Sequence, residues 1–171
     1  MTTHETQTAQ KRTSAGTSIN AQKLPRIYKA IRYILEGQPF IDYGCGRYTA
    51  HLKAYAESIG AEAHFFDPYN QPDSVNRETE AFTGAAFSIC SNVLNVIDSD
   101  RAVTECIAGA LRLGNGRAFF TVYEGDGSGR GAETQNGQSW QRNARLRDYA
   151  RFAPEGCKVT LRVGVMEVTR G

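Results

Sequence analysis

The sequence lacks several features that would decide its class at once. No run approaches the roughly 18 consecutive apolar residues that a membrane-spanning helix needs, and the first residues hold no apolar stretch of the kind found in a secretory signal. None of the four cysteines falls in a C-x-x-C pair, and the three histidines lie far apart. These absences predict no metal site, no membrane association, and reduced thiols in a cytoplasmic protein.

Net charge is also small. The chain carries +2 from 20 basic and 18 acidic residues, which is too little to indicate nucleic-acid binding by itself. The charge is unevenly spread, because residues 111–171 hold ten basic and six acidic residues. Arg142, Arg145, Arg147 and Arg151 share parts of one helix face if that segment is helical. Both a solvated face and a basic face for an acidic acceptor or nucleic acid remain open.

The length of 171 residues fits one domain. Residues 1–18 are rich in Thr, Ser and Gln and have almost no large apolar side chain to bury. We therefore expect a disordered N-terminal arm over 1–18 and a single domain over 19–171.

Apolar periodicity predicts an alternation of helices and strands along that domain. The helices are expected over residues 23–36, 48–59, 75–82, 100–112 and 140–152. The strands are expected over residues 39–43, 64–67, 85–90, 118–123, 158–163 and 165–168. Such alternation indicates an α/β fold with a doubly wound, Rossmann-like, mostly parallel sheet. The glycine-rich segment 125–143 is predicted as a long loop that could close over a substrate.

A glycine turn between the first strand and the next helix carries the chemical signal. Gly44 and Gly46 allow a tight turn and a close approach of the backbone to a ligand, although Thr49 leaves the G-x-G-x-x-G pattern incomplete. Asp67 follows Gly46 by 21 residues, at the end of the next strand. A carboxylate there can accept hydrogen bonds from the ribose hydroxyls of a nucleoside. The alternative is a glycine turn and a loop-capping aspartate in a domain that binds no such ligand.

Three segments resemble motifs of class I methyltransferases, which use S-adenosylmethionine (SAM). The run Asp42-Tyr43-Gly44-Cys45-Gly46 looks like their D-x-G-C-G motif, and Asp67 matches the acid that they place on the cofactor ribose. Residues 91–98 are similar to the S-x-V-L-x-H-V-x-D motif of their small-molecule branch, but Asn95 and Val96 stand where His is common. The resemblance covers about residues 24–123. Phe66-Asp67-Pro68-Tyr69 also looks like a group of compact bacterial and phage methyltransferases.

The resemblance implies a seven-stranded sheet with strand order 3-2-1-4-5-7-6. Only 17 residues separate Asp67 from Ala85, so we expect the third strand to be missing or reduced. The resemblance also implies SAM as the cofactor, bound by residues from three strand ends: Asp42, Tyr43, Gly44, Cys45, Gly46, Asp67, Pro68, Tyr69, Asn92 and Val93. The candidates for the substrate side lie at other strand ends and in the long loop: Asn95, Tyr123, Glu124, Trp140 and Arg142.

The implied activity is methyl transfer to an unidentified acceptor, for which we expect a small molecule. The amino-methyltransferase motif [DNS]-P-P-[YFW] is absent, because Val93 and Leu94 follow Asn92. Two alternatives remain open, a cofactor-binding partner subunit without its own catalysis and a methyltransferase directed at nucleic acid. The sequence assigns no catalytic residue, and it leaves open whether the chain forms a homo-oligomer or joins a partner chain.

Overall fold

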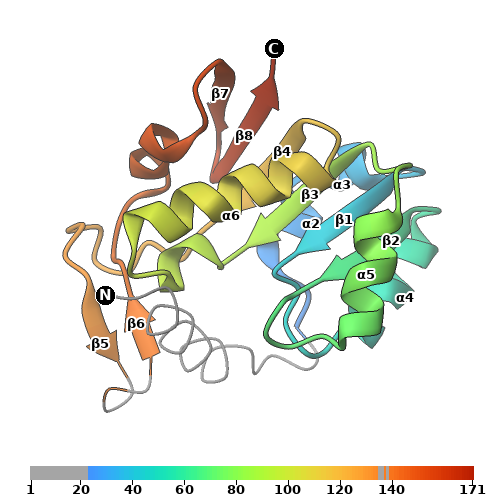
Figure 1. Ribbon diagram of the computed structural model, residues 1–171, viewed down its shortest axis with the longest axis horizontal. Coiled ribbons are helices and arrows are strands. Elements are labelled where there is room, and N and C mark those ends of the chain that lie inside the picture. The colour runs from blue at the N-terminus through green and yellow to red at the C-terminus, as the bar shows by residue number, and fades with distance from the viewer. Residues whose placement is uncertain (1–22, 135–136, 138) are drawn as a thin grey trace.

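The computed structural model describes residues 23–134, 137 and 139–171. They form one six-stranded sheet with the strand order β2-β1-β3-β4-β8-β7 and a separate two-stranded sheet, β5-β6 (Figure 1). The predicted arm over 1–18 lies outside the described residues. No helix in the described part of the chain has the length and apolar character to cross a membrane.

The six-stranded sheet is mostly parallel, as expected. β1 to β4 run parallel to one another, β8 is antiparallel to β4, and β7 is antiparallel to β8. The strands are β1 (Pro39–Tyr43), β2 (Glu62–Phe66), β3 (Phe87–Ser91), β4 (Arg117–Thr121), β7 (Cys157–Arg162) and β8 (Val165–Arg170). Phe40, Ile41, Phe87 and Ile89 are buried in the central strands, as side chains must be in a sheet covered on both faces.

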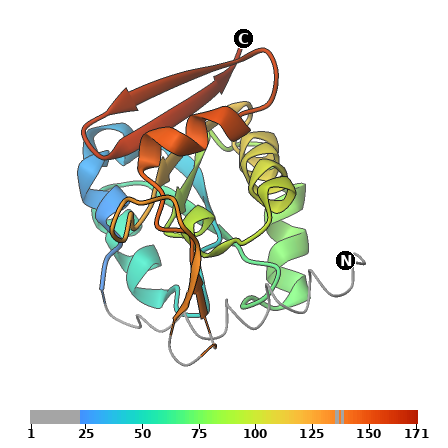
Figure 2. The same cartoon turned by 90° about the vertical axis from the view of Figure 1, so that its left-hand side faces the viewer.

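Helices cover both faces of this sheet. The helices are α2 (Arg26–Ala30), α3 (Arg32–Leu35), α4 (Ala50–Ser58), α5 (Asp73–Ala81) and α6 (Asp100–Leu113), with 3-10 helices η1 (Leu94–Val96) and η2 (Leu146–Phe152). α5 and α6 lie on one side, and α2 and α4 lie on the other (Figure 2). The apolar stripe of α6 packs with η2 over β3, β4 and β8, whereas α2, α3 and α4 bury a second cluster on the opposite face.

The expectation of a missing third strand is confirmed. Residues 67–86 contain α5 and loops but no strand, so β2 forms one edge of the sheet. The observed order equals the order 2-1-4-5-7-6 of the seven-stranded arrangement, with its outermost strand removed. The segment is too short for a strand with a second crossover helix, and one helix returns the chain directly to β3.

The prediction of a helix over 140–152 is wrong in its first half. Trp140 belongs to β6 (Ser139–Gln141), which pairs with β5 (Ala132–Thr134) as a hairpin inside the predicted loop 125–143. Asn143 then adopts a left-handed conformation with φ 55°, which no helix can continue through. Only the second half of the segment is helical, as η2.

The predicted helix over 23–36 is also divided. Ile31, with φ −117° and ψ 26°, separates α2 from α3. Pro25 stands immediately before the first helical residue, where its missing N–H costs no helical hydrogen bond. The two short helices still bury one apolar stripe, formed by Ile27, Ile31 and Leu35.

The end of α6 supplies a test of the packing. A Cβ added to Gly114 would lie 2.3 Å from the Ser88 backbone nitrogen and 2.4 Å from the Arg117 backbone oxygen, and backbone atoms of the sheet cannot move aside cheaply. We expect Gly114→Ala to lower the free energy of unfolding by more than about 2 kcal/mol in urea denaturation. Gly60→Ala, where the added Cβ meets nothing within 4 Å but φ is +67°, serves as the control and should cost only about 1 kcal/mol. Equal effects of the two substitutions would contradict the packing described for Gly114.

Candidate cofactor site

The glycine turn after β1 is held against the end of β2. The Gly44 amide donates to the Phe66 carbonyl at 2.7 Å, and the Cys45 amide donates to the same oxygen at 3.3 Å. Gly44 has φ +79°, and a Cβ there would lie 2.4 Å from Val93 Cγ2. The glycine therefore meets two requirements, a left-handed backbone and close contact with the loop that follows β3.

Asp67 joins the loop after β2 to the same turn. Its Oδ2 accepts the Gly46 amide at 2.9 Å, while Oδ1 accepts the amides of Tyr69 at 2.9 Å and Asn70 at 3.0 Å. The Asn70 side-chain amide donates to both carboxylate oxygens at 3.2 Å. Asp67 is 5% exposed, and these N–H donors fix its carboxylate between the two loops.

The backbone of Asp67 is fixed separately, by a side chain that the sequence analysis did not identify. Asn76 of α5 accepts the Asp67 amide at 2.9 Å through Oδ1 and donates to the Asp67 carbonyl at 3.0 Å through Nδ2. A buried amide with both of its groups paired holds a loop in one position. The single helix that replaces the missing strand thus also positions the predicted ribose-binding acid.

A cavity of about 510 Å³ opens at the carboxyl ends of β1, β2 and β3. This volume lies within the range of small-molecule sites, and ligands of open α/β sheets bind at this edge. The cavity brings together nine of the ten predicted cofactor residues: Tyr43, Gly44, Cys45, Gly46, Asp67, Pro68, Tyr69, Asn92 and Val93.

Asp42 is the one predicted cofactor residue that does not line the cavity. Its carboxylate is 3% exposed and accepts the Tyr28 hydroxyl of α2 at 2.7 Å. Burial raises the pKa of Asp42 to about 7, an effect that the Tyr28 hydrogen bond opposes and the charge of Asp67 increases. The residue lies behind the glycine turn and links β1 to α2.

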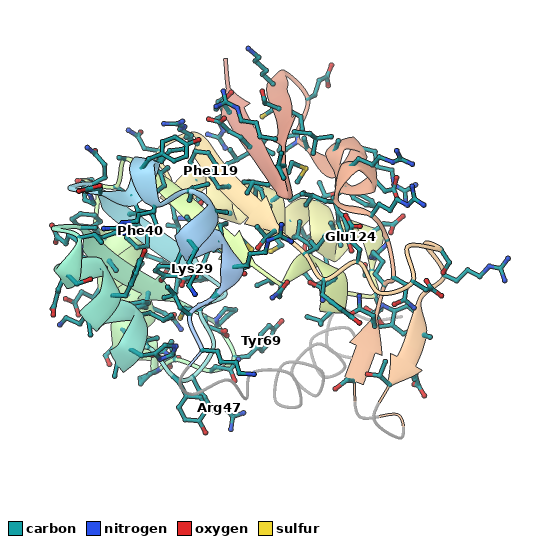
Figure 3. The ribbon with its side chains drawn as sticks, turned by 180° about the vertical axis from the view of Figure 1, so that it is seen from behind. Lys29, Phe40, Arg47, Tyr69, Phe119 and Glu124 are labelled. Atoms are coloured by element: carbon teal, nitrogen blue, oxygen red, sulfur yellow. The ribbon has the colours of Figure 1, made fainter. Side chains whose placement is uncertain are left out.

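The five substrate-side candidates lie elsewhere, and none of them lines the cavity. Asn95 and Tyr123 meet through Gln141: the Asn95 amide donates to Gln141 Oε1 at 3.1 Å, and Gln141 Nε2 donates to the Tyr123 carbonyl at 2.9 Å. Glu124 accepts the Leu146 amide at 2.8 Å, at the start of η2. Figure 3 shows Glu124 apart from Tyr69 and Arg47, on the other side of the view.

Trp140 and Arg142 also have structural contacts. The Trp140 ring packs over Gly131, where an added Cβ would clash with the ring. The Arg142 guanidinium donates to the Ile97 carbonyl at 2.9 and 3.0 Å, to the Asp98 carbonyl at 3.0 Å and to Asp100 at 2.6 Å. Because Ile97 lines the cavity, Arg142 supports the cavity wall from behind.

The cavity contains residues that the motifs did not indicate. The first described segment, 23–26, forms one wall, and His51 and Leu52 contribute from α4. Ala102, Glu105 and Cys106 of α6 form another part, and their i, i+3, i+4 spacing is a signal that places them on one helix face. Segment 23–26 has no comparable signal, because its position depends only on how α2 packs.

All four cysteines are free thiols. Burial raises the pKa of Cys45 far above its ordinary value, and the charges of Asp42 and Asp67 raise it further. The thiol that lies in the glycine turn is therefore protonated at neutral pH and is a poor nucleophile.

Comparison with known proteins bears on the fold. No protein-family model matches the chain, and no curated protein matches it. Among solved structures, magnesium protoporphyrin IX methyltransferase from Synechocystis PCC 6803, determined with bound SAM, is similar over 96% of this chain and 81% of that one. The TM-score is 0.50 and the sequence identity is 13%. The likeness shows the fold: this chain has the Rossmann-like fold of a SAM-dependent methyltransferase.

The buried carboxyl of Asp42 makes a testable contribution to stability. Because its pKa is about 7 in the folded protein and 3.8 ordinarily, the folded state holds the proton more tightly than the unfolded state. The free energy of unfolding should then fall as the pH rises from about 4 to 7.

In Asp42→Asn the amide oxygen can still accept the Tyr28 hydroxyl, but the side chain no longer titrates. We expect the decrease in the free energy of unfolding from pH 5 to pH 7.5 to be about 2 kcal/mol smaller in this variant than in the natural chain. Urea denaturation at the two pH values measures this difference. Asp73→Asn, at an exposed position on α5, is the control and should leave the difference unchanged. An unchanged difference in Asp42→Asn would show that Asp42 titrates normally.

Proposed function

We propose that the chain is a SAM-dependent methyltransferase that binds its cofactor in the 510 Å³ cavity. The observation that carries the proposal is the direct bond from the Gly46 amide to the Asp67 carboxylate. It brings a turn with two glycines and the acid predicted to bind the sugar to one edge of the sheet. The fold shared with a methyltransferase that holds SAM agrees with this assignment.

The residues present suit such a cofactor. The turn at Gly44 and Gly46 leaves room for close approach of the amino-acid part, and the carboxylate of Asp67 is the acceptor that a ribose diol requires. Val93, Val96 and Ile97 supply an apolar wall at the end of β3, against which an adenine ring can lie. Asn70 now donates to both oxygens of Asp67, so ribose hydroxyls would take over positions that its amide fills.

When bound, SAM supplies a methyl group on a sulfonium, which is already a good leaving group. The protein therefore needs chiefly to position the acceptor and exclude water, and positioning of this kind can supply roughly 7–11 kcal/mol. Asp67 and the glycine turn hold the donor side, and the apolar wall of Val93, Val96 and Ile97 excludes water. His51 and Glu105 also line the cavity. An imidazole or a carboxylate can take up a proton from the group that is methylated.

We further propose that the acceptor is a small molecule. The cavity is concave and of small-molecule size, and the similar solved structure is of an enzyme named for a small molecule, magnesium protoporphyrin IX. Nothing in the cavity wall presents the Asn-Pro-Pro turn that base-amino methylation uses, since Asn92 precedes Val93 there.

Calorimetry with SAM and with its demethylated product tests the cofactor assignment. We expect micromolar binding by the natural chain, and a loss of at least about 100-fold in Asp67→Ala, because that change removes the ribose acceptor and loosens the glycine turn. Gly44→Ala should also abolish binding, since its Cβ would overlap Val93. Asp73→Ala, an exposed carboxylate outside the cavity, should bind normally.

Circular dichroism of each variant separates lost binding from lost fold. Absence of binding by the natural chain would refute the cofactor assignment. Binding without methyl transfer to any component of a cell extract, and transfer only after a second protein is added, would instead identify a cofactor-binding partner subunit.

A further inference from the structure

A second cavity, of about 300 Å³, lies beside η2 and is separate from the SAM cavity. It is lined by residues that the proposed methyl transfer does not use: Gly129, Arg142, Ala144, Arg147, Asp148, Tyr149, Arg151 and Phe152. Three arginines and one carboxylate give this wall a formal charge of +2. The carboxylate of Asp148 is already engaged, because it accepts the Arg145 amide at 3.1 Å.

Two of the lining side chains are buried, and each has one hydrogen-bond donor without a partner among the described residues. Arg142 is 9% exposed. Its bonds to Ile97, Asp98 and Asp100 use four of the five N–H groups of a guanidinium, and the fifth has no partner among the described residues. Tyr149 is fully buried, and its hydroxyl has no hydrogen-bond partner in the described structure. Buried polar groups are normally paired, so two unpaired donors in one wall point to an acceptor from outside.

Two of the arginines also contact the same ring of the wall. The guanidinium carbons of Arg142 and Arg151 lie 5.6 and 4.7 Å from the centroid of Phe152. The charge of Arg142 is paired with Asp100, so Arg151 adds positive charge to the wall. Arg147, exposed on η2, adds a third positive charge, and its 3.9 Å contact with Asp148 is a weak ion pair.

We propose that this cavity is an anion site that takes a phosphate group. Arginine forks bind phosphate oxygens through paired N–H groups, and the Tyr149 hydroxyl adds a neutral donor. The site stands on its own residues and does not depend on methyl transfer. It gives a role to the arginines of the C-terminal third, although only Arg142, Arg147 and Arg151 contribute and Arg145 does not line the cavity.

Titration of the full chain with inorganic phosphate, followed by amide NMR at constant ionic strength, tests the proposal. We expect saturable shifts at residues 142–152. The double variant Arg147→Gln/Arg151→Gln should weaken binding roughly tenfold. The control Arg32→Gln/Arg77→Gln removes the same charge from exposed positions outside both cavities and should bind like the natural chain. Tyr149→Phe, which keeps the ring packing, should weaken binding by a smaller factor.

Shifts that do not saturate, or an equal loss in the control variant, would overturn the proposal and leave only non-specific attraction of anions. Competition then identifies the source of the phosphate. Displacement by a short oligothymidylate, with affinity that falls steeply with salt, indicates a nucleic-acid backbone. Displacement by pyrophosphate but not by the oligonucleotide indicates a phosphorylated small molecule. SAM affinity should be unchanged in Arg147→Gln/Arg151→Gln, so the failure of one proposal does not imply the failure of the other.

Discussion

The hydrogen bond from the Gly46 amide to the Asp67 carboxylate joins the loop after β1 to the loop after β2, and both loops line the cavity. It is supported on both sides: Gln71 Nε2 donates to the Gly46 carbonyl at 2.5 Å, and Asn76 pairs with the backbone of Asp67. A buried carboxylate that accepts this many N–H donors ties together the backbone segments that supply them. The loops after β1 and β2 consequently behave as one unit, and that unit forms the floor of the cavity.

The cavity wall at the end of β3 is held in place by Arg142, which does not line this cavity. The Arg142 amide donates to the Asn95 carbonyl at 2.7 Å, and its guanidinium binds three further groups between Ile97 and Asp100. Gln141 and Arg142, at the end of the hairpin strand β6, therefore set the position of residues 93–97, which carry the apolar wall. The two cavities are linked through this arginine, which supports one of them and lines the other. A buried arginine with this many carbonyl and carboxylate partners is costly to replace.

The sequence was sufficient for the sheet and for the placement of the glycine turn and Asp67 at one sheet edge, because both depend on local patterns. Strand-turn-helix spacing predicted Gly44, Gly46 and Asp67 at one edge, and the 17 residues before Ala85 predicted the lost strand. The contacts of the substrate-side candidates were not predictable in this way. Gln141 joins Asn95 to Tyr123, and Arg142 donates to the Ile97 carbonyl, by contacts between residues 18 to 46 positions apart. No local pattern reports such contacts, and the left-handed Asn143 ended a helix that apolar periodicity alone had favoured.

Loss of the outermost strand leaves β2 as a border of the sheet, with β7 as the other border. Unpaired backbone groups at a border invite addition of a strand from another molecule, with aggregation as the outcome. The chain places charged or titratable side chains at both borders: Glu62 and His64 form a 2.9 Å pair on β2, and Lys158 and Arg162 are exposed on β7. Two copies that met through β7 would bring ammonium and guanidinium groups against each other. The sheet therefore carries charged or titratable side chains that oppose uncontrolled association at both borders, including the β2 border that the missing strand exposes.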